Sequence, residues 1–476
     1  MYYEKPKSKI YFDRNQIEMI TLDELVPDDH LVKKIEKAIN FEFIHNLTKE
    51  YYSLENGRPC LDTVILFKLI LLNFLFGKNS IRATCEEASV NNAYRWFLGI
   101  SLIEKVPNYS TFSQNYIRRY KDTEVFKKIF TRIVTQIIEM NLIDPSVIFI
   151  DGTHIKASAN KHKVIKKEVK VVFDKYQKQM NQEIDEFREL NGRDKWHDDD
   201  QNGNTTIDEE TGEITKEEKE TVKEITISTV DEGCGMFVKG EHERQLAYVD
   251  QVACDKNGWI LGHTTNPGNM HDSKAFLPFF EEVILPYQPS IICTDAGYLT
   301  GLIAKNVQYQ GIKLLTPYMA PKGIRTIIGK KSFQYQMEID AYRCPNKKIL
   351  EPTNITKDGN IQYTITKKEC GECPYKKECL KNYNMKTITR PLYEDCVELA
   401  REYRLSEEGK DLYKLRKESI ERIFAQGKEY HGLRFTRFRG LKKNRYIRYL
   451  LYACLNIKKL ALLISKRANP YEYQLI

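Results

Sequence analysis

Two stretches of this sequence run from a short apolar segment into an aspartate with a small residue after it. The first is Val147–Ile150, which leads to Asp151 and Gly152, and the second is Ile291–Cys293, which precedes Asp295. Short apolar runs rich in β-branched residues are typical of strands buried on both faces of a parallel sheet. Parallel strands end at one edge of their sheet, so both carboxylates are expected at that edge. Taken alone, either aspartate could simply cap the turn after its strand.

The segments around these strands predict an α/β protein with a mixed sheet flanked by helices and an all-helical N-terminal domain. With 476 residues, the chain is long enough for several domains. We assign the catalytic domain to residues 141–318 and 400–465. A charged insert occupies about 160–225, in which Lys163–Leu190 is predicted as a helix and Asn191–Glu220 has too few aliphatic residues to form a core. A second insert, 319–399, carries cysteines.

Residues 1–140 are predicted to form several short helices joined by tight turns. Leu31–Ile39 and Val64–Leu72 have the apolar content of packed helices, and Gly77–Ser80 is typical of a turn with a helix N-cap. Thr111–Tyr120 carries polar Arg, Asn and Gln side chains. This pattern predicts a helix-turn-helix-like DNA-binding domain. The alternative is a helical bundle used for dimerisation.

A third acidic residue lies in a helical pattern near the C-terminus. Helical spacing over Leu412–Lys428 places Lys417, Glu421 and Lys428 on one face. Three converging carboxylates repel one another unless they hold cations, and oxygen ligands suit Mg²⁺ or Mn²⁺. Two such ions about 3.5–4 Å apart promote phosphodiester chemistry. Without the two aspartates nearby, Glu421 would be only a solvated helix residue.

Four cysteines of the second insert have a spacing typical of a metal site. Cys344, Cys370, Cys373 and Cys379 form the pattern C-x25-C-x2-C-x5-C. Four thiolates suit a closed, structural Zn²⁺ site. The insert is basic and poor in large aliphatic residues, so a metal would supply folding energy. The alternative is a set of reduced, unpaired thiols.

Residues 434–476 are predicted to form a basic segment that contacts DNA, followed by a final helix that packs on the sheet from Leu450 to Ile464. Cations that neutralise phosphates alternate here with aromatic residues that can stack on bases. The predicted DNA-binding residues, which include cations around Glu421, are Arg416, Lys417, Lys428, Arg434, Arg437, Arg439, Lys442, Lys443 and Arg445.

The sequence also limits the compartment. No basic-then-apolar signal pattern follows Met1, and the most apolar run, Val64–Phe76, is too short to cross a bilayer. The odd number of cysteines, eleven, argues for a reducing environment. We expect a cytoplasmic protein without membrane association.

The order and spacing of these motifs resemble the DDE transposases of bacterial insertion sequences, most closely the insertion-sequence 1182 group. The resemblance spans nearly the whole chain. The matching stretches are Ile150–Ala157, Asn269–Asp272, Thr294–Tyr298, Ile420–Lys428 and Arg434–Gly440, together with Leu25–His30 and the region from Gly77 to Arg119.

The resemblance implies a ribonuclease-H-like core with Asp151, Asp295 and Glu421 as catalytic acids that bind two Mg²⁺ or Mn²⁺ ions. Related enzymes place a Tyr and an Arg before the Glu at a fixed spacing, whereas here Tyr413 and Arg416 fall one residue early and Lys417 takes the slot. The phosphate-holding role of Arg416 therefore stays open, and Glu418 is an alternative third acid.

The resulting hypothesis is an enzyme that cuts DNA at the ends of its element and joins them to target DNA, acting as a homo-oligomer, a dimer. The alternatives are a ribonuclease-H-like nuclease without strand transfer and a domesticated, non-catalytic DNA-binding protein. Asp250, expected in mid-strand, and Asp272, expected at a helix N-cap, are assigned structural roles. Asp272 keeps a possible role near the metal site. Asp231 is left unassigned, and His154 is expected in a turn.

Overall fold

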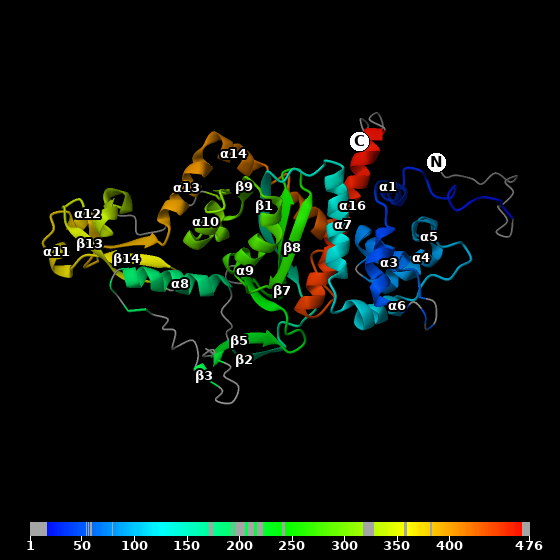
Figure 1. The fold of residues 1–476 in the computed structure, drawn as a ribbon, viewed down its shortest axis with the longest axis horizontal. Coiled ribbons are helices and arrows are strands. Elements are labelled where there is room, and N and C mark those ends of the chain that lie inside the picture. The colour runs from blue at the N-terminus through cyan, green and yellow to red at the C-terminus, as the bar shows by residue number, and fades with distance from the viewer. Residues whose placement is uncertain are drawn as a thin grey trace, which may run out of the picture. The chain divides into compact units, whose positions relative to one another are not determined.

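The computed structural model describes residues 17–468 except 54, 56, 58–59, 79, 171–174, 191, 193, 196–204, 208–213, 217–221, 240–242, 318–327, 357–358 and 381–382. The chain divides into two compact units (Figure 1). One contains residues 1–136 and 450–476, and the other contains residues 137–449.

The first unit is helical in its described part, as predicted. Side chains of Ser80, Asn91 and Asn108 accept hydrogen bonds from backbone N–H groups of the helices that they precede. These caps explain where the short helices begin. The elements are α1 (Leu31–Ala38), α2 (Phe43–Thr48), η1 (Lys49–Tyr51), α3 (Thr63–Leu75), α4 (Ile81–Val90), α5 (Asn92–Leu98), α6 (Tyr109–Asn115), a π-helical turn (Tyr116–Tyr120), most of α7 (Val125–Glu139) and the last part of α16 (Leu441–Ala468).

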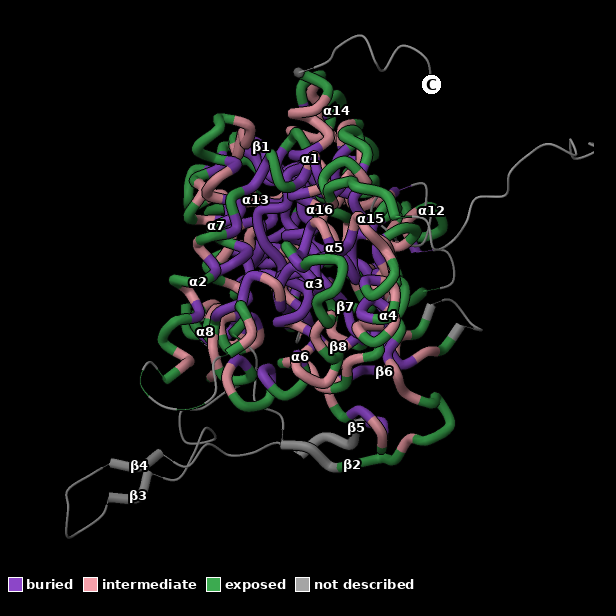
Figure 2. The backbone as a smooth tube through the Cα atoms, turned by 90° about the vertical axis from the view of Figure 1, so that its right-hand side faces the viewer, coloured by how far each residue is buried: buried purple, intermediate pink, exposed green. Residues whose placement is uncertain are grey.

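Helix α3 is the centre of this unit because it is buried on every side. All its residues except Ile65 are buried, and its one charge, Lys68, pairs with Glu36 at 2.8 Å. A helix that is apolar all round must be surrounded by other elements. Part of the cover comes from α16, where the Cys454 thiol lies 3.9 Å from the Leu71 carbonyl oxygen. In Figure 2, α3 has the colour of buried residues, and α16 is buried along its middle with half-buried and exposed residues toward its ends.

The end of α16 therefore differs from the prediction. The sequence predicted that the helix from Leu450 to Ile464 packs on the sheet, but residues 450–476 group with the N-terminal helices. The contact of Cys454 with Leu71 of α3 accompanies this grouping, and Leu451, Tyr452 and Leu460 in this half of α16 are buried.

The second unit is built on a six-stranded mixed sheet with the order β10-β9-β1-β7, in which both β6 and β8 pair with β7. Strands β9 and β10 run parallel to β1 and to each other, and the other pairs are antiparallel. The prediction of a mixed sheet is confirmed. The strands are β1 (Val147–Lys156), β6 (Gly235–Lys239), β7 (Glu243–Asp255), β8 (Ile260–Pro267), β9 (Ile291–Cys293) and β10 (Lys313–Leu315).

The pairing of β1 with β9 stops early and leaves an open edge. Its last pair is Phe149 with Cys293, so Asp151 and Asp295 each lie two residues beyond that pair. Beyond β9, strand β1 remains paired with β7 as far as Lys156. The predicted turn at Asp151 is thus a continuing strand, because β7 supports it from one side. On the other side, Lys156 bridges to Phe435.

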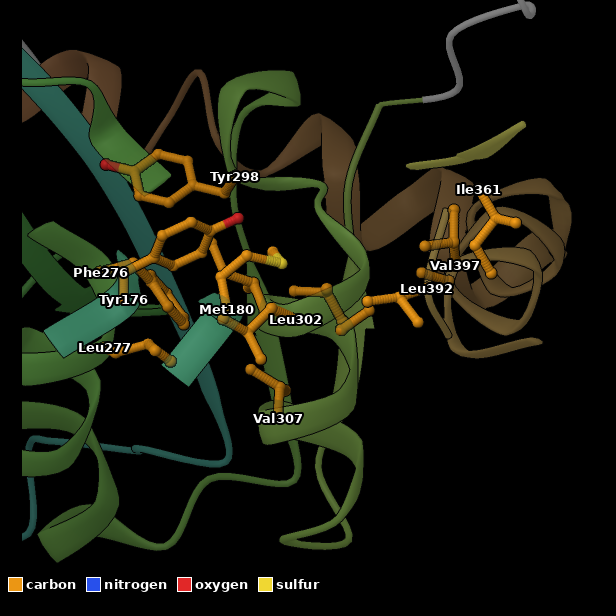
Figure 3. Close-up of a cluster of buried hydrophobic side chains, with 14 of the residues drawn as sticks. Tyr176, Met180, Phe276, Leu277, Tyr298, Leu302, Val307, Ile361, Leu392 and Val397 are labelled. Atoms are coloured by element: carbon orange, nitrogen blue, oxygen red, sulfur yellow. The ribbon is translucent and has the colours of Figure 1, made fainter. Parts of the chain in front are cut away.

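Helices cover the sheet and connect it to the cysteine-containing insert. Helices α8 (Lys175–Leu190), α9 (Asp272–Phe279) and α10 (Gly301–Gln308) share one hydrophobic core with β1 residues Ile148 and Ile150. The same core continues into the insert, and in Figure 3 Leu392 is drawn between Leu302 and Ile361. After α9 the chain forms a π-helical turn (Phe280–Ile284) and two 3₁₀ turns, η5 (Leu285–Tyr287) and η6 (Ala296–Tyr298).

The cysteine-containing insert has its own antiparallel sheet, in the order β11-β12-β13-β14-β15. It buries Leu350, Tyr363 and Ile388, so it has a core despite its small number of large aliphatic residues. A metal is therefore not its only source of folding energy. The elements are η7 (Lys330–Ser332), β11 (Gln334–Gln336), η8 (Met337–Ile339), β12 (Ala341–Arg343), β13 (Ile349–Ile355), β14 (Asn360–Thr364), α11 (Lys367–Gly371), α12 (Lys376–Leu380) and β15 (Thr387–Pro391).

The charged insert departs from the predicted helix at its start. Residues Val164–Lys170 form β2, which pairs with β5 (Val222–Ser228), and α8 begins only at Lys175. Val164, Lys166 and Glu168 are spaced two residues apart, which is the repeat of a strand, and β5 supplies the pairing partner. Most of Asn191–Glu220 lies outside the described residues; the described part includes the pair β3 (Thr205–Ile207) and β4 (Ile214–Lys216).

The predicted helix over Leu412–Lys428 is interrupted. Helices α13 (Glu394–Leu405) and α14 (Glu407–Lys414) are followed by a turn at residues 415–419, and α15 (Ile420–Tyr430) begins after it. Lys417 lies in the turn, so it does not share a continuous helix face with Glu421 and Lys428. The backbone N–H of Glu421 bonds the Arg416 carbonyl at 3.1 Å, so the turn closes directly onto α15.

The contact between α10 and the end of the insert gives a stability prediction. A Cβ atom at Gly301 would lie 1.8 Å from the Leu392 carbonyl oxygen. Gly301→Ala should therefore lower the free energy of unfolding by about 1–3 kcal/mol through overpacking. Urea unfolding measures the change, with Gly329→Ala as the control, because a Cβ there meets no atom within 4 Å. Equal midpoints for both variants would contradict the contact.

Candidate active site

Asp151 and Asp295 reach the same level at the open edge of the sheet. Each is two residues past the Phe149–Cys293 pair, and side chains two residues apart on a strand share a face. The ladder itself has ended there, but the charge of Asp295 acts on Asp151, so the two residues lie near each other at the edge. Asp295 makes no side-chain cap to the turn η6 that follows it. Helix or turn capping therefore does not explain Asp295.

The Asp151 carboxylate is held between a backbone donor and a buried arginine. Its Oδ1 accepts a hydrogen bond from the Gly152 N–H at 2.8 Å, and its Oδ2 lies 2.7 Å from Nη2 of Arg416. The Asp151 side chain is 22% exposed and that of Arg416 only 5%. A guanidinium this buried is stable only with a partner, so the pair forms a fixed contact of the site.

Burial raises the pKa of Asp151 to about 6, against the opposing effect of the Arg416 charge. The charges of Asp295 and Asp272 raise it further. Burial also raises the pKa of Asp272, again with a contribution from Asp295. Three aspartates therefore lie close enough to repel one another, and such a cluster in a partly buried position is typical of a functional site.

Asp272 is the member of this cluster for which the sequence predicted mainly a structural role, with a role near the metal site only as an alternative. It was expected to cap a helix, but the N-cap of α9 is His271, whose Nδ1 accepts from the Ser273 N–H at 3.3 Å. Asp272 is the first helical residue, and its carboxylate is directed at the sheet edge, where a Cβ on Gly152 would lie 2.9 Å from Oδ1. The resemblance at Asn269–Asp272 was the signal that could have found it.

Glu421 lies in the first turn of α15, which packs against β1 and β7. Its carboxylate is exposed and forms no hydrogen bond or ion pair with any residue that the structure describes. The alternative acid, Glu418, is also exposed in the preceding turn. The structure thus brings α15 to the strand of Asp151 and leaves the Glu421 carboxylate available.

Within the described ranges, no three His, Cys, Asp or Glu side chains converge closely enough, as they stand, to hold a metal ion. At the sheet edge this agrees with the contact that Asp151 makes to Arg416. The donor set nevertheless fits a divalent cation, because it consists of carboxylate oxygens at a partly buried, negatively charged edge of the sheet.

The basic segment lies beside the end of β1. The Lys156 N–H bonds the Arg434 carbonyl at 3.0 Å, and the Thr436 N–H bonds the Lys156 carbonyl at 2.9 Å. Thr436 is buried, while the side chains of Arg434, Arg437 and Arg439 are exposed. In this short extended stretch, an arginine therefore points to solvent at every second or third residue.

Comparison with known families gives two matches. A family model described as "Transposase domain (DUF772)" matches residues 20–118, and one described as "Transposase DDE domain" matches residues 343–461. Together the two matches support an insertion-sequence DDE transposase. The second match includes Glu421 and the basic segment, and Asp151, Asp272 and Asp295 lie between the two matched ranges. No curated protein and no solved structure matches the chain.

The cations predicted to contact DNA in this transposase fall into two groups. Lys417, Lys442 and the three arginines of the basic segment are exposed, and Lys428 and Lys443 are half-buried. By contrast, Arg416 binds Asp151, and Arg445 donates to the Thr265 carbonyl at 3.0 Å. These two side chains face the protein, so direct phosphate contact is a weaker expectation for them.

Other singled-out residues of the transposase are structural in their contacts. Asp250 is fully buried in β7 and lies 3.4 Å from Nε of Arg448. Asp231 accepts hydrogen bonds from the Tyr248 hydroxyl and from the Gly440 N–H, at 3.0 Å for the latter, and so ties the basic segment to β7. His154 lies in β1, not in a turn, and stacks on Phe237.

The four predicted zinc ligands come together in the cysteine-containing insert. Cys344, Cys370, Cys373 and Cys379 line one cavity of about 30 Å³. Burial raises the pKa of the Cys379 thiol, and the other three cysteines add to the effect against the lowering by Lys386. They do not form a closed metal-binding group as they stand.

The structure was also searched for segments that could cross a membrane. In the described part of the chain, no helix is both long and apolar enough to do so.

The Arg416–Asp151 pair gives a pH-dependent prediction. Arg416→Met should lower the free energy of unfolding at pH 8 by about 2–3 kcal/mol, because it leaves a buried carboxylate without its partner. The pKa of Asp151, already raised to about 6, rises further without Arg416, so the carboxyl is neutral at pH 5 and the loss shrinks there. Urea unfolding at both pH values measures this, with the exposed Arg422→Met as the control. An equal loss at both pH values would contradict the pairing.

Proposed function

We propose that this transposase cuts DNA at the ends of its mobile element and joins them to target DNA by metal-dependent phosphodiester hydrolysis and transesterification. The observation that carries the proposal is the register of β1 and β9, which brings Asp151 and Asp295 to one level at an open sheet edge. The family match supports it, because the matched DDE domain contains Glu421. We assign the catalytic roles to Asp151, Asp295 and Glu421.

We further propose that the sheet is a ribonuclease-H-like core. Three antiparallel strands, β1, β7 and β8, are followed through α9 and α10 by two strands parallel to β1. In such a sheet, a phosphodiester site is expected at the edge where the parallel strands end. Membership of the insertion-sequence 1182 group stays a proposal that rests on the motifs in the sequence.

The divalent cations of this proposal, two Mg²⁺ or Mn²⁺ ions, would be held by Asp151, Asp295 and Glu421. When bound, such ions activate a water or a 3′-hydroxyl and stabilise the departing oxygen. The chain's own residues do the rest. Arg416 orients Asp151 through its 2.7 Å contact, and the exposed arginines of the basic segment hold the phosphates of the DNA backbone beside β1.

The DNA interface that we propose includes the basic segment and the turn before α15. The members most accessible to DNA are the exposed cations Lys417, Arg434, Arg437, Arg439 and Lys442. Arg434 forms an ion pair with Glu429 at 2.7 Å. Such surface pairs contribute little, so phosphate can replace Glu429 at small cost. Lys428, Lys443, Arg445 and Arg416 complete the proposed set, and Arg416 also contacts Asp151.

For the remaining parts, we propose that the N-terminal helical domain binds DNA in a helix-turn-helix-like manner and that the enzyme works as a dimer in the cytoplasm. The short, capped helices α4, α5 and α6 support the first point. All eleven cysteines are free, which is consistent with a reducing compartment.

We also propose a structural Zn²⁺ at Cys344, Cys370, Cys373 and Cys379. The shared cavity of the four thiols supports it. The buried core of the insert means that the ion would stabilise a sheet that already packs.

Cleavage of terminal-repeat DNA tests the catalytic assignment. Asp151→Asn, Asp295→Asn and Glu421→Gln should each lower the rate with Mg²⁺ by more than about 100-fold, because each removes a ligand charge. Glu418→Gln, an exposed acid three residues away, is the matched control and should keep the rate within about twofold.

The products separate the alternatives. Joined products from element ends and a target plasmid support the transposase reaction. Cleavage without joining favours a hydrolytic nuclease. A wild-type protein that binds DNA but neither cuts it nor binds Mn²⁺ favours a non-catalytic DNA-binding protein.

Metal analysis of the purified protein tests the zinc proposal. We expect one Zn²⁺ per chain, and Cys370→Ser should lose it and lower the melting temperature, because a closed site needs all its ligands. Cys396→Ser is the control, since Cys396 is a half-buried cysteine of α13 outside the cavity. Equal zinc contents in the two variants would sink the assignment.

A further inference from the structure

Asp272 lies in the first turn of α9, where an acidic side chain suits the helix dipole, but it does not cap the helix. The N-cap role belongs to His271. The Asp272 carboxylate instead projects to the open sheet edge, and the backbone carbonyl of Asp272 is fixed by Nε2 of Gln251 at 2.9 Å. The residue is thereby held against β7 while its acid group remains directed at the edge.

Two glycines leave room for this carboxylate. A Cβ on Gly152 would lie 2.9 Å from Oδ1 of Asp272, and a Cβ on Gly297 would lie 3.6 Å from Oδ2. Gly152 directly follows Asp151, and Gly297 comes two residues after Asp295. The Asp272 carboxylate is therefore enclosed by the two segments that carry the proposed catalytic aspartates.

The alternation of side chains along β1 agrees with this position of the Asp272 carboxylate. Consecutive strand residues point to opposite faces, so Asp151 and Gly152 face opposite sides. Asp272 approaches from the Gly152 side. Strand β9 ends at Cys293, so the sheet is open next to Asp151. The three carboxylates can therefore affect one another electrostatically from both faces of the sheet.

Two buried polar side chains hold the Asp272 carboxylate in this place. Tyr298 and Gln251 are both fully buried, and the Gln251 side chain interacts with the Tyr298 hydroxyl and with the Asp272 carboxylate. In Figure 3 the Tyr298 hydroxyl points away from Leu302 and Leu392, and the charges of Asp272 and Asp151 act on it.

We propose that Asp272 is a fourth carboxylate of the cation site, which binds a divalent ion together with Asp151 and Asp295 across the open sheet edge. Carboxylates brought together from both faces of the sheet surround an ion more completely than those of one face. The inference rests on the proposed function, since it assumes that the edge binds Mg²⁺ or Mn²⁺. It adds a ligand from α9, which the order of the three acidic motifs does not include.

Titration of the DNA-free protein with Mn²⁺ tests this role. Asp272→Asn keeps the shape of the side chain and should weaken Mn²⁺ binding at least about tenfold. Glu407→Gln is the matched control, because Glu407 is also an acid in the first turn of a helix but is exposed in α14. It should bind Mn²⁺ as the wild type does.

A second variant leaves every carboxylate in place. Gly152→Ala should push the Asp272 carboxylate out of the edge and weaken Mn²⁺ binding in the same direction, whereas Gly329→Ala, in open space, should not. If Asp272→Asn fails to fold, Gly152→Ala decides the question.

Melting temperatures separate a cation ligand from a structural residue. Without metal, Asp272→Asn should melt at the wild-type temperature or above it, because one of three repelling charges is gone. The rise in melting temperature that Mn²⁺ causes in the wild type should be largely lost. A lower melting temperature without metal, combined with an unchanged rise on adding Mn²⁺, would overturn the inference.

The failure of this inference is distinct from that of the proposed function. A wild type that binds Mn²⁺ and cuts terminal-repeat DNA, with Asp272→Asn equal to it in Mn²⁺ affinity, overturns the role of Asp272 alone. A wild type that neither binds Mn²⁺ nor cuts DNA overturns both.

Discussion

The short parallel pairing of β1 with β9 is the constraint on which the rest of the second unit depends. Three residue pairs, ending at Phe149 and Cys293, set the level of both aspartates and also end the sheet on that side. Strand β1 continues past this point because β7 holds it, so a single strand borders the edge. Strand β1 therefore positions the parts of the proposed site, from the carboxylates to the basic segment, which is bridged to β1 at Lys156.

A buried arginine balances part of the charge that this arrangement concentrates. Arg416 comes from the turn before α15 and neutralises Asp151, while Asp272 and Asp295 keep like charges nearby. The departure of Tyr413 and Arg416 from the family spacing fits this contact, because the interrupted helix lets the turn reach the sheet. In a continuous helix from Leu412 to Lys428, as the spacing predicted, Arg416 would follow the helix surface instead.

The sequence was most informative where a local pattern and its neighbours agree. The two strand-then-aspartate stretches, the capped N-terminal helices and the parallel direction of β1 and β9 could all be predicted. The pattern could not show that β1 would continue beyond Asp151, because the support comes from β7, almost 100 residues later. It also could not show that α3 would need the end of α16, or that His271 would take the cap and leave Asp272 directed at the edge.

The basic segment shows how a positive surface can be placed beside an acidic site without being drawn into it. Buried Asp231 accepts the Gly440 N–H and both hydrogen-bonding contacts of the Tyr248 hydroxyl, so the loop that ends the segment is fixed from below. Thr436 bonds Asn444 at 2.6 Å inside the protein, which fixes the middle. Between these anchors, the side chains of Arg437 and Arg439 are exposed. Their charge is therefore directed outward, where a phosphate backbone that passes the sheet edge would meet it.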